Sequence, residues 1–144
     1  MLKHVWAFLR GGTACLNPAE LKLIDALIEA LPHDEAKILK AQIAKIDLVQ
    51  RPQAGRMTIA FYRKNLDVAL FKQDGYEYCL AKLHYLSGGK KRVTSIVLHD
   101  GKFMSIERNI PLKVNDVTKV IEVILHPDDY KPVAEEIDAE EHGV

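Results

Sequence analysis

The sequence predicts an α+β domain in which an N-terminal helical hairpin packs on an antiparallel five- to six-stranded meander sheet. Two observations lead to this prediction. Apolar residues recur at every third or fourth position up to about residue 50, and at every second position from Met57 onward. Turn-forming residues then separate several successive apolar runs, which favours hairpins between strands that are neighbours in the chain.

The first helix is predicted from Asn17 to Leu31. Asn17 is a favourable N-cap, Pro18 suits the first helical position, and Glu20 completes a capping box. One face of this helix is apolar and carries Leu21, Ile24, Leu27, Ile28 and Leu31. The Leu31-Pro32 step ends the helix.

A second helix is expected to begin at the acidic residues Asp34 and Glu35, which suit a helix N-terminus. Its apolar stripe runs through Ile38 or Leu39, Gln42 or Ile43, Ile46 and Val49, so we expect the helix to continue to Val49. The two helices together would cover one face of the sheet.

Five strands are expected in the second half of the chain, at residues 57–62, 66–72, 76–86, 91–99 and 102–108. The turns between them lie at Lys64-Asn65, Asp74-Gly75, Ser87 to Lys90 and Asp100-Gly101. Residues 117–125 fit either a helical stripe or a strand. Because most of them are β-branched, the sequence favours a strand there.

The net charge of zero conceals an uneven distribution along the chain. Residues 128–144 hold seven acidic residues and one lysine, a net charge of −6, and the preceding 127 residues carry +6. We therefore expect a single α+β domain over residues 1–127, followed by an acidic, disordered tail over residues 128–144. A tail that folds back on the basic surface of the domain is the alternative.

The sequence predicts a cytoplasmic protein without a membrane segment. The apolar run from Val5 to Leu9 is ended by Arg10 and is too short for an export signal, and no run is long enough to span a bilayer. Cys15 and Cys79 are too few for a disulfide framework, so we expect ordinary thiols in a reducing compartment.

A small polar cluster on the sheet is the candidate partner-binding site. Two-residue turns at Gly88-Gly89 and Asp100-Gly101 would place His84 opposite Val93 and His99 opposite Lys102. Four polar residues would then share one sheet face around Val93: Lys82, His84, Ser95 and Arg108. In the same register Tyr78, Leu80, Met104 and Ile106 lie on this face, and Cys79, Ser105 and Glu107 lie on the opposite one.

No catalytic, metal or cofactor site is predicted, and we do not expect an enzyme. His84 and His99 would share a face but lie about 20 Å apart along the strands, too far to share a metal. The other histidines have no partner at metal-motif spacing. Cys79 lies centrally in a strand, where burial would suppress its reactivity.

The alternative function is nucleic-acid binding. Arg51, Arg56, Arg63, Lys64 and the run Lys90 to Arg92 give the sheet region a basic side. The excess of bases over acids is nevertheless smaller than in typical nucleic-acid-binding domains, and no aromatic RNA-binding motif is present. We therefore expect another protein, and not a nucleic acid, as the partner; the sequence leaves the oligomeric state open.

The stretch from Val97 to Glu107, VLHDGKFMSIE, resembles a strand-turn-strand segment of small bacterial α+β proteins of unknown function and of some immunity proteins of toxin systems. The resemblance implies a non-enzymatic protein-binding domain, one form of which is an immunity-type inhibitor that occludes a bacterial toxin. A nucleic-acid-binding protein whose basic sheet surface is masked by the acidic tail is the runner-up.

Overall fold

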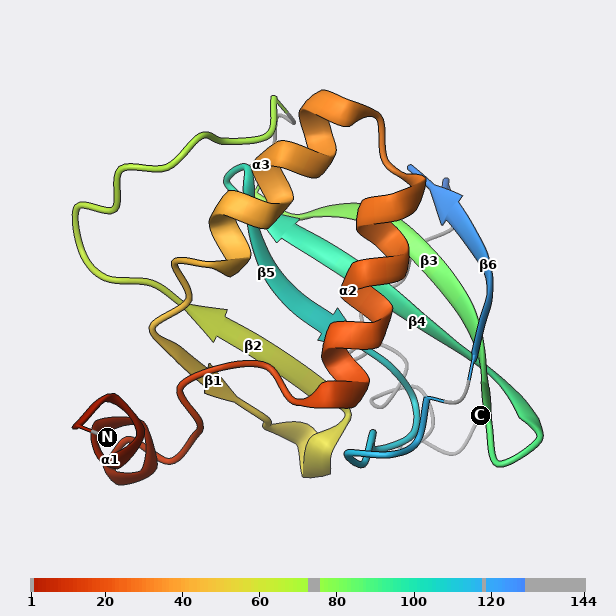
Figure 1. The fold of residues 1–144 in the computed structure, drawn as a ribbon, viewed down its shortest axis with the longest axis horizontal. Helices are drawn as coiled ribbons and strands as arrows, with labels where there is room; N and C mark the ends of the chain where they lie inside the picture. The colour runs from red at the N-terminus through yellow and green to blue at the C-terminus, as the bar shows by residue number, and fades with distance from the viewer. Residues whose placement is uncertain (1, 73–75, 118, 129–144) are drawn as a thin grey trace.

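A computed structural model describes residues 2–72, 76–117 and 119–128 of the chain (Figure 1). Helices come first and strands follow, which confirms the predicted α+β class. The elements are α1 (Leu2–Leu9), α2 (Pro18–Ala30), α3 (His33–Ile43), β1 (Leu48–Gln50), the 3-10 turn η1 (Gln53–Gly55), β2 (Met57–Phe61), β3 (Tyr78–Ser87), β4 (Lys90–His99), β5 (Lys102–Glu107) and β6 (Lys119–Leu125). The predicted acidic tail lies, from residue 129 onward, outside the described residues.

The six strands form one antiparallel sheet in the order β1-β2-β5-β4-β3-β6. β3, β4 and β5 follow one another through tight turns, as the meander prediction expects. β2 then pairs with β5, and β6 pairs with the far edge of β3. The helices α2 and α3 lie side by side on one face of this sheet (Figure 1), so the main core forms between them and the strands.

The start of α2 agrees with its sequence signals. The Asn17 side chain accepts a hydrogen bond from the Glu20 backbone N–H, and the Glu20 carboxylate accepts one from the Asn17 N–H, both at 2.8 Å. Pro18 occupies the first helical position. The reciprocal bonds satisfy backbone donors that would otherwise lack a partner at the helix N-terminus.

The predicted extension of the second helix to Val49 is wrong, because α3 ends at Ile43 and Leu48–Gln50 form strand β1. Val49 pairs with Ala60 of β2 on one side and forms an isolated bridge with Thr13 on the other. Ile46 and Val49 are buried through these tertiary contacts, and in the sequence their spacing resembled a continuing helical stripe. Pairing partners from distant segments override the local pattern here.

The predicted strand at residues 66–72 is also wrong. This segment is extended but unpaired in the sheet, and it runs beside α3 after leaving β2 (Figure 1). It is anchored by single hydrogen bonds: Phe71 N–H donates to Gly101 O at 2.9 Å, and Gln42 Nε2 donates to Ala69 O at 2.9 Å. We call residues 66–72 the strap.

The predicted pairings of His84 with Val93 and of His99 with Lys102 are confirmed. Two bulges alter the register away from the turns. In the first bulge, Cys79 pairs with Val97 and Ala81 with Ile96, so β3 has one extra residue between Cys79 and Ala81. In the second bulge, Val97 pairs with Ser105 and Leu98 with Phe103, so β5 has one extra residue between Phe103 and Ser105. One extra residue moves every later side chain to the other face. The predicted faces are therefore wrong for residues beyond each bulge, namely Tyr78, Cys79, Ser105, Ile106, Glu107 and Arg108.

The ambiguous segment at residues 117–125 contains strand β6, which confirms the strand preference and excludes the helical alternative over Lys119–Leu125. β6 pairs with β3 from Leu86↔Lys119 to Ala81↔Leu125. Its alternating exposed and half-buried side chains are typical of an edge strand with one face toward the core.

Candidate functional site

Helix α1 exposes most of its apolar surface to solvent. Five of its side chains are between 55% and 79% exposed: Leu2, Val5, Trp6, Phe8 and Leu9. Single exposed apolar residues are ordinary on protein surfaces, but a contiguous group of this kind marks an interaction site. The helix also carries Lys3 and His4, contains no acidic residue, and is followed directly by Arg10.

The body of the protein holds α1 by a small buried contact and a glycine cap. Ala7 packs against Ala14 and Leu48 in a cluster separate from the main core. Gly12 N–H donates to Ala7 O at 2.9 Å and Gly11 N–H donates to Phe8 O at 3.0 Å, with Gly11 at a φ of +77°. These bonds form a Schellman-type cap, which commonly ends a helix.

A close backbone contact fixes the chain directly after α1. Thr13 and Val49 exchange two backbone hydrogen bonds of 2.9 and 2.7 Å. At Gly12 a Cβ atom would lie only 2.1 Å from Val49 O, so a residue without a side chain is required there. Helix α1 therefore has a defined position near β1, at one end of the molecule (Figure 1).

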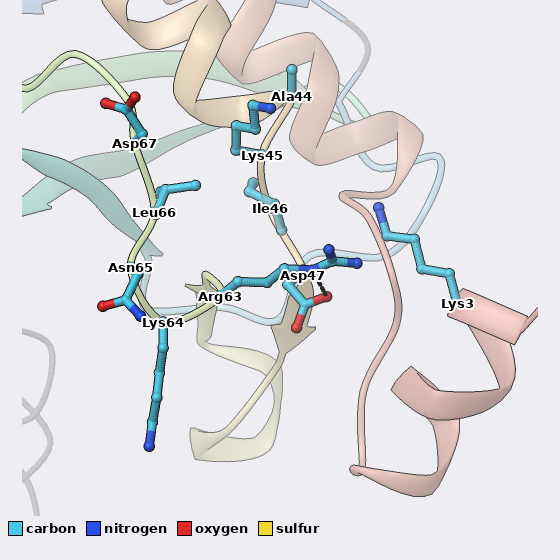
Figure 2. Close-up of a pocket in the computed structure, with 10 residues that line it drawn as sticks. All are labelled: Lys3, Ala44, Lys45, Ile46, Asp47, Arg63, Lys64, Asn65, Leu66 and Asp67. Atoms are coloured by element: carbon cyan, nitrogen blue, oxygen red, sulfur yellow. Dashed lines mark ion pairs between the residues drawn. The ribbon is translucent and has the colours of Figure 1, made fainter.

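Two hollows of about 370 and 200 Å³ adjoin α1 and share Lys3, Ala44 and Ile46 in their walls. We call them together the α1 groove. The larger hollow lies between Lys3 of α1, the segment 44–47 after α3, and the loop 63–67 (Figure 2). The smaller one is more apolar and extends toward α2, with walls that include Ala14, Cys15, Leu16, Leu21 and Ile43.

The larger hollow is basic. Its walls contain Lys3, Lys45, Arg63 and Lys64 against the two acids Asp47 and Asp67. Asp47 is already paired, since its Oδ2 lies 3.1 Å from Arg10 Nη1 and its Oδ1 lies 3.7 Å from Arg63 Nε. One acid, Asp67, then remains against Lys3, Lys45 and Lys64, so the hollow keeps a net positive charge. An acidic group on a partner would find an attractive potential there.

A buried ionic network connects α2 to the sheet. The Glu20 carboxylate accepts hydrogen bonds from Arg51 Nη2 at 2.8 Å, Arg51 Nε at 3.1 Å and Thr58 Oγ1 at 2.5 Å. Arg108 Nη1 in turn donates to Thr58 Oγ1 at 2.9 Å. Burial alone would raise the pKa of Glu20, but the hydrogen bonds from Arg51, Thr58 and the Asn17 backbone together lower it below its ordinary value.

This network bears on the predicted basic surface. Arg51 is engaged with Glu20 and with Thr13 Oγ1, at 2.8 Å, and is therefore held away from any phosphate. Arg63 has a side chain that is 82% exposed and Lys64 is exposed, so both remain accessible. Of the basic residues that the sequence suggested for nucleic-acid binding, Arg51 has a structural role.

The four predicted partner-binding residues are divided between the two sheet faces. Lys82 pairs with Ser95, and His84 pairs with Val93, on the face opposite α2 and α3. His84 Nε2 lies 3.9 Å from Glu122 Oε1 on β6. Arg108 instead points toward Thr58 on the helix side, because the bulge near Met104 shifts the end of β5 by one residue. The prediction that Arg108 shares a face with the other three is wrong.

Neither cysteine belongs to a reactive cluster in the described residues. Cys79 is buried and burial raises its pKa to about 11, which suppresses thiolate formation at neutral pH. Cys15 is exposed beside the smaller hollow of the α1 groove.

Over the described ranges, no three His, Cys, Asp or Glu side chains come together as a metal site. No helix in the same ranges is long and apolar enough to cross a bilayer.

The α1 surface was not found by sequence reasoning, although two signals for it are present. The run from Val5 to Leu9 is apolar and, like all of residues 2–9, contains no acidic residue. Gly11-Gly12 directly after an apolar segment is the expected C-terminal signature of a helix. The exposure of α1 cannot be predicted from its own residues, because it depends on how little of the rest of the protein packs against the helix.

Comparisons with known proteins gave no relative. Scans against protein-family models, curated proteins and solved structures each found no match to this chain.

Proposed function

We propose that this chain is a non-enzymatic protein-binding domain that holds its partner at α1 and the α1 groove. The observation that carries the proposal is the exposure of five large apolar side chains on a single eight-residue helix. Burying such side chains on a partner contributes about 25 cal/mol per Å² of apolar area removed from water. Aromatic side chains such as Trp6 and Phe8 are also enriched in the cores of protein interfaces.

The charge around α1 supports a partner with an acidic rim. Lys3, Lys45 and Lys64 border the groove, and α1 itself has no acidic residue. Oppositely charged rims accelerate association and exclude partners of the wrong charge. We propose an immunity-type inhibitor as the finer form of this function, in which α1 occludes a toxin through a face bearing acidic groups.

Site-specific photo-crosslinking tests the location of the partner. A photoreactive phenylalanine analogue would replace Phe8, and in a matched control it would replace Tyr76, since both side chains are 79% exposed. We expect a discrete crosslinked partner from position 8 and none from position 76 in cells of the source organism. Equal products from both positions, or none from position 8, would contradict the proposed surface.

The immunity form has a separate genetic test. A toxin gene beside the gene for this chain would be expressed with and without the chain, and growth measured. The wild-type chain should restore growth, and Phe8→Glu should not, because the substitution places a charge in the apolar contact. Protection by Phe8→Glu equal to wild type would contradict a role for α1 in toxin binding.

Nucleic-acid binding remains the second candidate because the larger hollow of the α1 groove carries four basic side chains. Phosphate contacts make such binding steeply salt-dependent. Fluorescence anisotropy with labelled single- and double-stranded oligonucleotides would measure it. Sequence-selective binding that persists at physiological salt and is lost in Lys45→Glu would favour this candidate over the protein partner.

A further inference from the structure

A second pocket lies where β5 leaves the sheet. β5 pairs with β4 only as far as Ser95↔Glu107, whereas β4 continues beside β3 to Lys90. The β3–β4 hairpin consequently projects beyond the end of β5 (Figure 1). The diverging chains leave a pocket of about 170 Å³, which we call the Tyr85 pocket, lined among others by Tyr85, Lys91, Arg92, Val93, Arg108 and Ile110.

The Tyr85 pocket is positively charged. Lys91, Arg92 and Arg108 contribute three cations to its wall. The acid whose charge acts on Tyr85 is Asp116, and one of its oxygens accepts a hydrogen bond from Lys113 N–H at 2.7 Å. Counting Asp116 against Lys91, Arg92 and Arg108 leaves a formal excess of two positive charges; Glu20 also acts on Arg108 but is already paired with Arg51.

Arg108 is the buried cation of the pocket, with only 3% of its surface exposed. Its Nη atoms donate to Thr58 Oγ1, Ile106 O and Gly55 O. Its Nε has no hydrogen-bond partner, and the Glu20 carboxylate, whose charge acts on Arg108, is itself hydrogen-bonded to Arg51. A buried guanidinium with a free donor is costly unless another group completes its hydrogen bonds.

Tyr85 supplies a phenolic hydroxyl as a second polar group. The residue is only 2% exposed, its ring belongs to the main core, and it lines the pocket. Its phenol lies close enough to Arg92 and Arg108 for both charges to act on it, and all three residues line the same pocket. A phenolic O–H in the wall of a pocket can donate a hydrogen bond to an oxygen of a bound ligand.

We propose that the Tyr85 pocket binds the phosphoryl group of a phosphate monoester. The formal excess of two positive charges matches a phosphate group, which carries about −1.5 to −2 at pH 7. Arginine donors and a phenolic O–H are suited to phosphate oxygens. The volume is below the roughly 300 Å³ at which pockets enclose a whole small molecule, so the ester substituent lies outside. Val93 and Ile110, each 42% exposed, border the pocket there.

NMR titration of the full chain with inorganic phosphate and with phenyl phosphate, at constant ionic strength balanced with chloride, tests this site. We expect saturable shifts of the Arg92, Val93 and Ile110 amides, with tighter binding of phenyl phosphate because its ring contacts Val93 and Ile110. Absence of saturation would overturn the site. Phenyl phosphate binding no tighter than inorganic phosphate would overturn the monoester assignment.

Variants distinguish a specific phosphate-binding site from nonspecific electrostatic attraction. Tyr85→Phe keeps the ring and removes only the hydroxyl, and it should weaken phosphate binding about tenfold, the value of one charge-assisted hydrogen bond of about 1.4 kcal/mol. Arg92→Gln should also weaken it. Arg63→Gln, which removes an equal charge at the α1 groove, should leave binding unchanged. Equal loss in Arg63→Gln, or unchanged binding in Tyr85→Phe, would overturn the proposal.

The melting temperature of the ligand-free Tyr85→Phe protein provides a further check. If the hydroxyl serves a bound ligand and not the fold, its removal should leave the melting temperature unchanged or raise it. A clear decrease in the melting temperature would show that the hydroxyl has a structural partner in the protein, and this would overturn its assignment as a ligand-binding group.

Discussion

Glu20 is a fully buried carboxylate that serves both as a helix cap and as the counterion of Arg51. Glu20→Gln would preserve the cap, since glutamine also completes a capping box, and would remove the charge. We expect a loss of about 3–5 kcal/mol of unfolding free energy at pH 7, because the substitution leaves the half-buried Arg51 without its carboxylate. Urea denaturation would measure the loss, and a loss below about 1 kcal/mol would contradict the structural role of this charge.

The same variant should show a weaker pH dependence. The pKa of Glu20 is lower in the folded protein than its ordinary value of 4.5, so the folded state releases this proton more readily than the unfolded state. Its stabilisation is then present above about pH 4.5 and is lost as the pH falls through the folded-state pKa. We expect the gap in unfolding free energy between wild type and Glu20→Gln to narrow on acidification. A gap that widens would show that the pKa is raised.

Leu83 tests the packing of β3 against the helices. Leu83→Ala should lower the unfolding free energy by about 2–5 kcal/mol, because Leu83 has no exposed surface and its truncation leaves a cavity. Leu70→Ala is a matched control in the strap, where the side chain is 49% exposed and the cost should stay within about 0.5 kcal/mol. Similar losses in both variants on chemical denaturation would show that β3 is misplaced.

At the residue scale, the sequence predicted which residues pair near each turn but not which face they occupy farther along. His84 lies opposite Val93 as expected, because the Gly88-Gly89 turn fixes that register locally. Arg108 lies on the opposite face from the one predicted, because a bulge inserts one residue before it. Such a bulge has no distinctive side chain here, so alternation alone could not reveal it.

At the element scale, the strap at residues 66–72 depends on one turn between β4 and β5. Gly101 has a φ of +77°, and a Cβ atom there would lie 2.7 Å from Phe71 O. Its carbonyl also accepts hydrogen bonds from Phe71 N–H and from Gln42 Nε2. The glycine is therefore required both by the turn and by the strap that crosses it.

Gly101→Ala should be more destabilising than the same change at Gly88. Each alanine would adopt a left-handed backbone, which costs about 1–2 kcal/mol. Gly88, with a φ of +55°, has no atom within 4 Å of the added Cβ, whereas Gly101 has the Phe71 carbonyl. The difference in unfolding free energy between the two variants measures the contact with the strap. Equal losses would show that the strap does not rest on this turn.

The strap also explains why one element was predicted wrongly. Its alternation resembled a strand, but two groups outside the sheet, the buried Gln42 side chain and the Gly101 carbonyl, satisfy its backbone at Ala69 and Phe71. Gln42 further accepts a hydrogen bond from Phe103 N–H at 2.8 Å. A polar residue within an apolar helical stripe was the available signal, because a buried amide needs partners of this kind.

At the scale of the whole molecule, the order of helices and strands was predictable and the placement of α1 was not. The capping box, the change of period and the hairpin turns are local signals, and together they specify the α+β class. The docking of α1 depends on contacts between segments far apart in the sequence: Ala7 with Leu48, Thr13 with Val49, and Arg10 with Asp47 and Gln50. Candidate sites that depend on contacts between segments distant in the sequence can be recognised only in the folded structure.

The uneven distribution of charge gives a prediction for the whole chain. Removing residues 128–144 would change the formal net charge from zero to +6, and the remaining domain keeps exposed cations such as Lys64. The truncated chain should bind DNA weakly at low salt and lose that binding at physiological salt, because charge attraction without a specific contact is screened. Full-length protein should bind less at every salt concentration. Anisotropy titrations across salt would measure both, and sub-micromolar, sequence-selective binding by the truncated chain at physiological salt would instead favour a nucleic-acid-binding function.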